Sequence, residues 1–332
     1  MKRFILFLVV LAILGGGAWF WEQQNFQAPG PSEKYAVVLV QSGDRVSTIA
    51  QNLAAAGVIS NAELFRFSLR IRNLQGTLKA GEYGFPAHAS MADVAGIIAS
   101  GKSILHKLTA AEGLTSEMIA AIVNADPVLV GDPVAVPEEG TLLPETYLFI
   151  RGTTRAEIIA DMQRAQVRLL AKLWPERASG LPVNTVGEAI ILASIVEKET
   201  AIPAERRHIA AVFANRLRLG MKLQSDPTII YDITRGYPLG RGIRRSELDR
   251  ASPHNTYAIP GLPPTPICNP GRDAIAAVLN PHSSGDLYFV ANGSGGHVFS
   301  ATDAEQNRNV AKWRQIEQQQ KKPQLPAPHS RR

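Results

Sequence analysis

One carboxylate, Glu197, stands at the end of an otherwise apolar stretch that begins at Glu188 and continues as Ala-Ile-Ile-Leu-Ala-Ser-Ile-Val. An apolar environment opposes the charged form of an acid and raises its pKa, so the group can hold a proton near neutral pH and deliver it during bond cleavage. This residue in this setting therefore indicates a general acid. A structural interpretation stays open beside it. Glu197 would then lie where the helix meets water and pair with Arg206 or Arg207, because structural ion pairs also perturb acids.

The chain after Glu197 is dense in polar and turn-forming residues of the kind that line sugar clefts. Sugars present hydroxyl rims and weakly apolar ring faces, which amides, carboxylates and aromatic rings can contact. Taken singly, each segment also has a structural explanation, because Pro and Gly clusters build turns and Tyr288-Phe-Val290 is typical of a core strand. The order and wording of the whole run are more informative than any single part.

Five segments of this run carry a family resemblance. They are Ala193-Ser-Ile-Val-Glu-Lys-Glu-Thr200, Leu223-Gln-Ser-Asp-Pro-Thr228, Asn255-Thr-Tyr257, Gly261-Leu-Pro-Pro264 and Gly295-Gly-His297. Together they are similar to the MltG/YceG-like family, the membrane-anchored endolytic murein transglycosylases of bacteria, and the resemblance covers nearly the full chain. It implies cleavage of nascent peptidoglycan strands at the bond from N-acetylmuramic acid to N-acetylglucosamine, which leaves a 1,6-anhydro end and terminates strand elongation. The catalytic acid of the family falls on Glu197, and no cofactor is implied.

A single carboxylate is enough for that reaction, although standard glycosidases need two. The muramyl C6 hydroxyl belongs to the substrate, so one Glu can protonate the glycosidic oxygen and then accept the C6 proton during ring closure, helped by the high effective molarity of an intramolecular attack. Glu197 is the expected acid and base. Glu199 lies two residues further on the same helix, about 200° around it, so its side chain points to the opposite side. We expect Glu199 to orient the substrate.

Substrate-binding candidates are taken from the matched motifs, and each could instead be structural. Asp226 before Pro227, for example, could cap a helix or form a turn. The side chains expected to position the glycan and to stabilise positive charge at the sugar ring are Gln224, Asp226, Thr228, Tyr231, Asn255 and Tyr257.

Two other functions remain open. In a muramidase-type hydrolase, Glu197 would be the acid and Asp226 or Glu199 its partner. A non-catalytic peptidoglycan-binding scaffold would tether the synthesis machinery without cleaving anything.

Metal, nucleotide and nucleic-acid chemistry are not indicated. His254, His282 and His297 lack a ligand spacing such as H-E-x-x-H, the single Cys268 cannot build a multi-Cys zinc site, and no Walker loop is present. The formal charge of +6 is spread along the chain, which indicates an anionic neighbourhood rather than a nucleic-acid groove. Contacts with penicillin-binding proteins are implied by the family alone.

The N-terminus indicates where these groups work. Residues 1–3 are basic, and residues 4–21 carry no charge, which is about the minimum length that crosses a bilayer. The positive-inside tendency places Lys2 and Arg3 in the cytoplasm, and Trp19-Phe-Trp21 suits the far interface. We expect a single-pass anchor in the bacterial inner membrane, with the catalytic domain on the periplasmic side. A cleaved signal peptide is the competing interpretation.

The remaining chain predicts an α+β protein with a small module and a larger mixed α/β catalytic domain. A flexible linker is expected over 22–34. Residues 35–105 read as strand, helix, helix and strand, and Val40-Gln-Ser-Gly-Asp-Arg-Val-Ser-Thr-Ile-Ala50 resembles the opening of the glycan-binding LysM family. The catalytic domain is expected over 106–312. A loose C-terminal tail, rich in Gln, Lys and Pro, is expected over 313–332.

Overall fold

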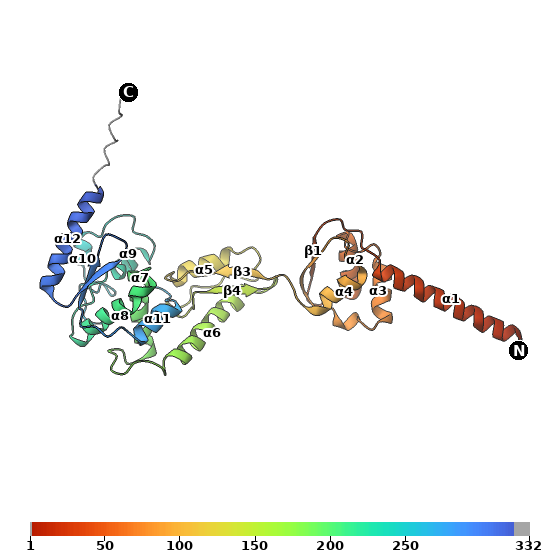
Figure 1. The fold of residues 1–332 in the computed structure, drawn as a ribbon, viewed down its shortest axis with the longest axis horizontal. Helices are drawn as coiled ribbons and strands as arrows, with labels where there is room; N and C mark the ends of the chain where they lie inside the picture. The colour runs from red at the N-terminus through yellow and green to blue at the C-terminus, as the bar shows by residue number, and fades with distance from the viewer. Residues whose placement is uncertain (1, 322–332) are drawn as a thin grey trace, which may run out of the picture. The chain divides into compact units, whose positions relative to one another are not determined.

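The computed structural model describes residues 2–321 and contains two compact units. The first comprises the described residues up to Lys107, together with Val128–Val130 and Leu148–Thr153. The second comprises Leu108–Pro127, Gly131–Tyr147 and the chain from Thr154 onward. Helices and short strands are mixed in both (Figure 1), so the expected α+β class is confirmed.

The first unit is built on an antiparallel strand pair, with Ala36 opposite Phe85 and Val40 opposite Gly81. In chain order it contains α1 (Lys2–Gln27), β1 (Ala36–Val40), α2 (Val46–Ala55), α3 (Ala62–Ile71), the short 3-10 helix η1 (Gln75–Thr77), β2 (Gly81–Phe85) and α4 (Met91–Ser100). The expected order of strand, helix, helix and strand is therefore present. Apolar residues at strand and helix spacing fill one core, including Val38, Leu53, Phe65, Leu69, Tyr83, Phe85 and Ile98.

Helix α1 continues past the expected end of the membrane segment and joins the core of the first unit. Phe26 is 5% exposed and Glu22 only 2% exposed. The Glu22 carboxylate accepts hydrogen bonds from Ser68 Oγ and, at 2.6 Å, from Arg72 Nη1, and the Arg72 guanidinium lies 4.1 Å from the centre of the Phe26 ring. The linker expected from residue 22 therefore begins only after Gln27. Partners some 50 residues away keep these residues helical.

Helix α1 is long and apolar enough to cross a bilayer, and a signal sequence has the same length and composition.

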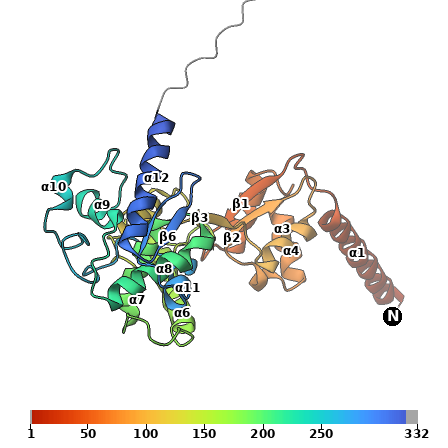
Figure 2. The ribbon, with the colours of Figure 1, turned by 60° about the vertical axis from the view of Figure 1, so that its left-hand side comes forward.

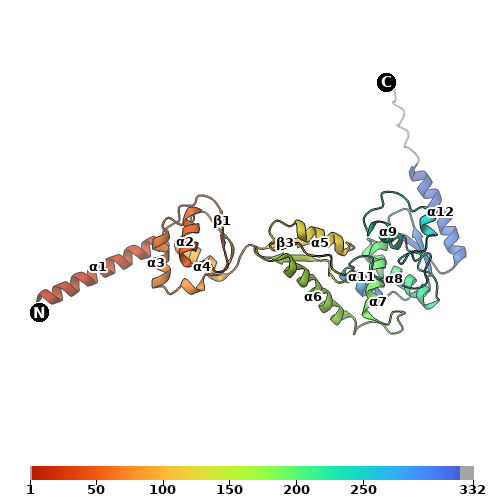
Figure 3. The same cartoon turned by 180° about the vertical axis from the view of Figure 1, so that it is seen from behind.

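The second unit places three helices against one another around its core. These are α7 (Val186–Glu199), α8 (Pro203–Arg218) and α11 (Arg272–Leu279), which lie together in Figure 3. Helix α7 begins where Thr185 Oγ1 accepts the Glu188 N–H at 3.1 Å, and Pro203 occupies the first turn of α8, where its missing N–H costs no helical hydrogen bond. Ala189, Leu192, Ala193, Ile195 and Val196 are buried, so α7 is a core helix. It is therefore a rigid support for its carboxylates.

The other elements of the second unit surround these helices. In chain order they are α5 (Ser116–Ala125), α6 (Arg155–Leu173), α9 (Asp226–Thr234), α10 (Arg245–Leu248), the antiparallel pair β5 (Tyr288–Ala291) and β6 (His297–Ser300), and α12 (Asp303–Lys321). A further two-stranded sheet, β3 (His106–Thr109) and β4 (Thr146–Phe149), carries the chain from the first unit into the second and back.

The C-terminal region differs from the expected loose tail. Residues 313–321 continue helix α12, which packs on β5 and β6 (Figure 2). The packing of this polar helix on the strand pair explains its order, since its composition alone indicates disorder. The rest of the expected tail lies outside the described residues.

Candidate active site

The last turn of α7 presents two carboxylates, Glu197 and Glu199, to one surface pocket. The helix stops there because Thr200 takes an extended conformation and its Oγ1 accepts the Ile202 N–H at 3.0 Å. The pocket has a volume of about 350 Å³. It is lined by Glu112, Gly113, Glu197, Lys198, Glu199, Thr200, Ala201 and Arg206.

Glu197 is held by fixed partners on both oxygens. Oε2 accepts the backbone N–H of Gly271 at 2.8 Å, and Oε1 lies 3.4 Å from Arg206 Nη2. Arg206 Nη2 also lies 3.4 Å from Glu112 Oε2, and Arg206 Nη1 lies 3.2 Å from Asp273 Oδ2. One arginine therefore forms ion pairs with three carboxylates. The pairing with Arg206 that the sequence left open is therefore present.

Gly271 leaves room for the Glu112 side chain because it has no side chain of its own. A Cβ at this position would lie 2.0 Å from Glu112 Oε1.

Burial raises the pKa of Glu197 above its usual range, as expected from the sequence. The carboxylates of Glu112 and Asp273 raise it further, whereas the Gly271 N–H and the Arg206 charge oppose the shift. Its side chain is only 5% exposed. Glu197 is thus a perturbed acid with both oxygens already engaged.

Glu199 has a different set of neighbours. Its Oε1 accepts a hydrogen bond from Ser225 Oγ. Burial raises the pKa of Glu199 to about 7, and the nearby Asp226 carboxylate acts in the same direction, while Ser225, His297 and Arg216 oppose the shift. A carboxyl group with this pKa exchanges its proton at neutral pH. Glu199 therefore has the property that the sequence assigned to Glu197.

A turn before α9 places Ser225 beside Glu199. Gln224 adopts a left-handed conformation with φ of 53°, and its N–H donates to Thr256 O at 3.1 Å. The Ser225 N–H donates to Thr256 Oγ1 at 2.9 Å, and Thr228 Oγ1 donates to Ser225 O at 2.6 Å. The segment around Thr256 thus fixes the serine that contacts the acid.

The structure brings three of the predicted binding residues to the Glu199 side of the site. Tyr257 donates its hydroxyl to Asp226 Oδ1 at 2.7 Å. The Asp226 carboxylate raises the pKa of Glu199, and the Glu199 charge raises the pKa of Tyr257. Gln224 is exposed, and its Oε1 accepts from Arg216 Nη1 at 3.3 Å. Gln224 and Asp226 are exposed and Tyr257 is half-buried, and none of the three is among the residues that line the pocket.

Thr228 and Asn255 are fully buried and are used within the protein. Thr228 holds Ser225 and Thr256, and the Asn255 amide donates to the carbonyls of Glu247, Leu248 and Arg250. These two residues shape loops and do not face the pocket beside Glu199.

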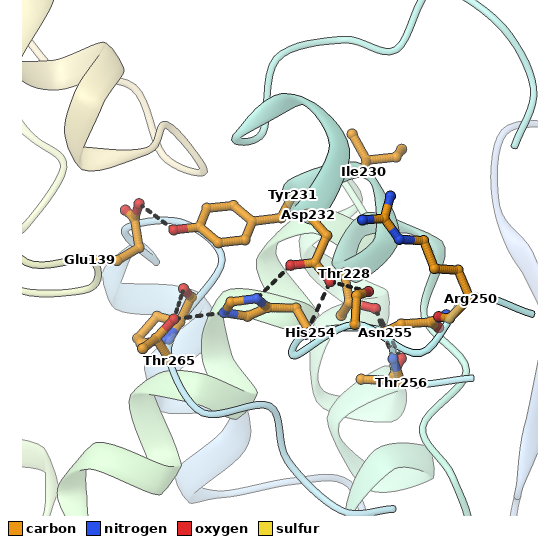
Figure 4. Close-up of polar contacts among 12 residues, drawn as sticks. Glu139, Thr228, Ile230, Tyr231, Asp232, Arg250, His254, Asn255, Thr256 and Thr265 are labelled. Atoms are coloured by element: carbon orange, nitrogen blue, oxygen red, sulfur yellow. Dashed lines mark hydrogen bonds and ion pairs between the residues drawn. The ribbon is translucent and has the colours of Figure 1, made fainter. Parts of the chain in front are cut away.

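Tyr231 faces another part of the unit. Its hydroxyl donates to Glu139 Oε2 at 3.3 Å, and its ring meets His254 edge-on (Figure 4). It lines a second pocket rather than the one beside Glu199.

Sequence reasoning did not select Ser225 and Arg216 as functional residues. Ser225 lies inside a motif that was noted, so its type and position were visible. Arg216 is a charged residue on a largely buried helix, and its side chain is only 8% exposed. A charged residue at such a helix position is a signal that the sequence displays. Its guanidinium donates to the carbonyls of Leu287 and Leu223 at 2.6 and 2.8 Å.

Among residues 2–321, no group of three or more His, Cys, Asp or Glu side chains is arranged to hold a metal ion. The chemistry available at the pocket is proton transfer by two carboxylates with different surroundings.

Comparisons with known proteins agree on one family. A model of the YceG-like family matches residues 38–312. The endolytic murein transglycosylase of Streptococcus pneumoniae strain D39 is 31% identical, over 94% of this chain and 65% of the relative, so the chain spans less than two thirds of that protein. The protein of the same name from Bacillus subtilis is 29% identical over 90% of both chains. The crystal structure of a YceG-like protein from Listeria monocytogenes matches with a TM-score of 0.52 and 31% identity, covering 83% of this chain and 99% of the other.

Proposed function

The chain belongs to the YceG-like family, and we propose that it is an endolytic peptidoglycan transglycosylase. It cleaves nascent glycan strands at the bond from N-acetylmuramic acid to N-acetylglucosamine, leaves 1,6-anhydro ends and so terminates elongation. The names of the relatives support this reaction class. The observation that carries the mechanism is the carboxyl group of Glu199, with a pKa of about 7 at the wall of a pocket.

Glu199 acts as acid and then as base. It donates its proton to the glycosidic oxygen as the C1–O bond breaks, and the resulting carboxylate accepts the proton of the muramyl C6 hydroxyl as O6 bonds to C1. The carboxyl group ends protonated again, and no water is consumed. A pKa near the working pH suits both steps, since the group must give and take a proton in turn.

Glu197, which the sequence indicated as the acid, serves as a positioning residue in this mechanism. To act as the acid it would have to release the Gly271 N–H and the Arg206 guanidinium. We assign it to holding the loop at Gly271 and the Arg206 side chain against the pocket. Glu197 is the competing acid, and the rates of Glu197→Gln and Glu199→Gln distinguish the two assignments.

Three side chains are the proposed glycan contacts. Asp226 is exposed and ends in a carboxylate that can stabilise positive charge at the sugar ring. Tyr257 orients that carboxylate by its 2.7 Å hydrogen bond, and Gln224 offers a planar amide. Thr228 and Asn255 act through the loops that they hold.

We place the catalytic unit outside the bacterial inner membrane, anchored by a retained single-pass helix with Lys2 and Arg3 in the cytoplasm. Retention is supported by Glu22 and Phe26, because the apolar helix continues without a break into residues that fill the first unit's core. The strand, helix, helix, strand order supports a LysM-like module over 35–105. Penicillin-binding proteins that make the nascent strand are the proposed partners.

The test is the mass of the products from uncrosslinked glycan. The wild-type chain should release anhydro-ended fragments, and Glu199→Gln should release them only at a small residual rate. Fragments heavier by one water would instead identify a muramidase-type hydrolase. Pelleting with sacculi without any product would identify a scaffold and overturn the proposal.

A further inference from the structure

A second pocket of about 730 Å³ lies in the catalytic unit and is not used by the proposed reaction. Its size is within the range of ~300–1,000 Å³ typical of ligand sites. Its lining combines apolar side chains with a few polar groups, which is the usual composition of such sites. Its lining includes Glu138, Gly187, Ile190, Tyr231, Arg235 and Thr265.

The polar rim of the second pocket is arranged to accept hydrogen bonds. His254 Nδ1 lies 2.8 Å from Asp232 Oδ1, and His254 Nε2 lies 2.8 Å from Thr265 Oγ1 (Figure 4). The Asp232 carboxylate also accepts the His254 backbone N–H at 3.0 Å, so the imidazole is fixed. Thr265 Oγ1 also lies 3.2 Å from Pro266 O, so the hydroxyl is held from two sides, and its exposed oxygen keeps a lone pair for a ligand.

Tyr231 adds a second acceptor on the pocket wall. Its hydroxyl proton is directed to Glu139 Oε2, and Arg235 also interacts with the phenolic oxygen, so a ligand would share this acceptor with Arg235. Glu139 cannot turn away, because its other oxygen accepts the Ser116 N–H at 2.8 Å and the Asn269 amide at 3.1 Å. Two preset acceptors favour a ligand rich in N–H donors.

The charges at the rim complement a peptide with both signs. Glu138 and Arg235 are exposed and line the same pocket, so a free amine can pair with the first and a carboxylate with the second. Ile190 and two prolines of the 264–266 segment supply apolar contacts for methyl groups. Amide N–H groups, alanine methyls, free carboxylates and, before crosslinking, a free side-chain amine are together the chemistry of a peptidoglycan peptide stem.

The second pocket and the Glu197–Glu199 pocket lie in sequence along one face of α7. Ile190 lines the second pocket and Glu197 lines the other. Seven helical residues correspond to about 10 Å of rise and only about 20° of rotation. Between them on that face Ser194 is fully buried and its Oγ accepts the Ile267 N–H at 3.0 Å, so a strand that reaches both pockets passes over the segment around Ile267.

We propose that the second pocket binds the uncrosslinked peptide stem of the strand that is cleaved beside it. This inference rests on the proposed function for the identity of the substrate. It makes the enzyme selective for strands whose stems still carry the free amine, which is the state of newly made material.

Direct binding tests the inference without any cleavage. The probe is a free stem pentapeptide with a diamino acid at its third position, titrated by calorimetry into the full-length Glu199→Gln chain in detergent. Gly187 is exposed and lines the pocket, and a Cβ there meets only Thr185 Oγ1, at 3.9 Å, so position 187 accepts a side chain and Gly187→Leu is designed to occupy part of the pocket. We expect Gly187→Leu to weaken binding by about tenfold or more, the equivalent of one or two hydrogen bonds and their apolar contacts.

Two controls make the result specific. Gly96→Leu changes another helical glycine with open space around it, in the first unit, and should leave binding unchanged. Acetylating the side-chain amine of the peptide should weaken its binding to the unblocked chain. Absence of binding without the pocket substitution, or equal binding by Gly187→Leu, overturns the inference.

Cleavage then separates this inference from the proposed function. We expect a higher kcat/KM for stem-bearing strands than for strands stripped of stems by an amidase, and we expect Gly187→Leu to lose that preference. Equal rates on both substrates would contradict the stem pocket while leaving the transglycosylase assignment intact. If neither substrate yields anhydro ends, the proposed function fails, and the peptide titration still decides whether the pocket binds stems.

Discussion

Glu197 and Glu199 are the same residue type, two positions apart on one helix end, yet they have opposite surroundings. Glu197 meets a backbone N–H and a guanidinium, which hold both of its oxygens. Glu199 meets the Ser225 hydroxyl and a neighbouring carboxylate, Asp226, and burial leaves the pKa of its carboxyl group at about 7. In the proposed mechanism a raised pKa, which both carboxyl groups have, is not sufficient for the acid. The proton must also be free to leave.

The largest expected effect separates these two carboxylates. Glu199→Gln should lower the rate of anhydro-end formation by about 10²–10⁴-fold, the usual contribution of a general acid and base. Glu197→Gln should lower it by roughly tenfold, because the amide can still accept the Gly271 N–H and only the Arg206 pair is lost. Initial rates on uncrosslinked glycan, with thermal unfolding as a folding control, measure both. The reverse order of effects would return the catalytic role to Glu197.

The next effect is on the pH dependence of the rate. The first step needs protonated Glu199, so kcat/KM should fall about tenfold per pH unit above the pKa of about 7. Glu199→Gln should lack this limb in its residual rate. A flat profile between pH 6 and pH 9, to be measured with short purified strands, would contradict Glu199 as the acid.

The same pKa shift has a consequence for stability. The folded-state pKa of Glu199 is raised from the ordinary 4.5 to about 7, so between these values the folded protein binds more protons than the unfolded chain. The contribution is fully present below about pH 4.5 and is lost as the pH rises through about 7. The free energy of unfolding of Glu199→Gln should not show this decline, which denaturant titrations at several pH values can measure.

The sequence predicted a helix end that carries acid chemistry, but it did not predict how the surroundings of Glu197 and Glu199 differ. Helical periodicity predicted that Glu197 and Glu199 point to opposite sides, whereas both line one pocket and differ in the partners that they meet there. The sequence named Arg206 as a possible partner of Glu197, but it could not place Gly271 beside Glu197 or Ser225 beside Glu199, because both come from distant parts of the chain. Thr228 and Asn255 looked like ligands for the same reason, since a polar residue in a matched motif gives no indication that its partner is a backbone carbonyl.

The fold shows the same limit. The α+β class and the strand, helix, helix, strand order follow from local apolar spacing, which the sequence displays directly. Helix α1 extends to Gln27 because Ser68 and Arg72 bind Glu22, and those contacts are not local. Local composition therefore predicted a linker where tertiary packing forms a helix.

Ser225→Ala removes the hydroxyl that donates to Glu199 and leaves the contacts of Glu197 unchanged. The serine hydroxyl lowers the pKa of Glu199, so its removal should raise that pKa further and move the falling limb of the pH profile to higher pH. The maximal rate at low pH should change by less than tenfold. An unchanged limb would mean that the titrating group is not Glu199.

Thr228→Val should have the smallest effect on catalysis, although it alters a residue of the same motif. Thr228 Oγ1 donates to Ser225 O at 2.6 Å and contacts Thr256 Oγ1 at 3.0 Å, and valine keeps the shape without these bonds. The loss should lower the free energy of unfolding by about 1–3 kcal/mol, the usual cost of leaving buried polar groups unpaired. The Ser225 N–H still binds Thr256 Oγ1, so the serine stays beside Glu199 and kcat/KM should remain within about twofold. If KM rose tenfold while stability stayed constant, Thr228 would contact the glycan itself and the boundary drawn between binding and loop-holding residues would be wrong.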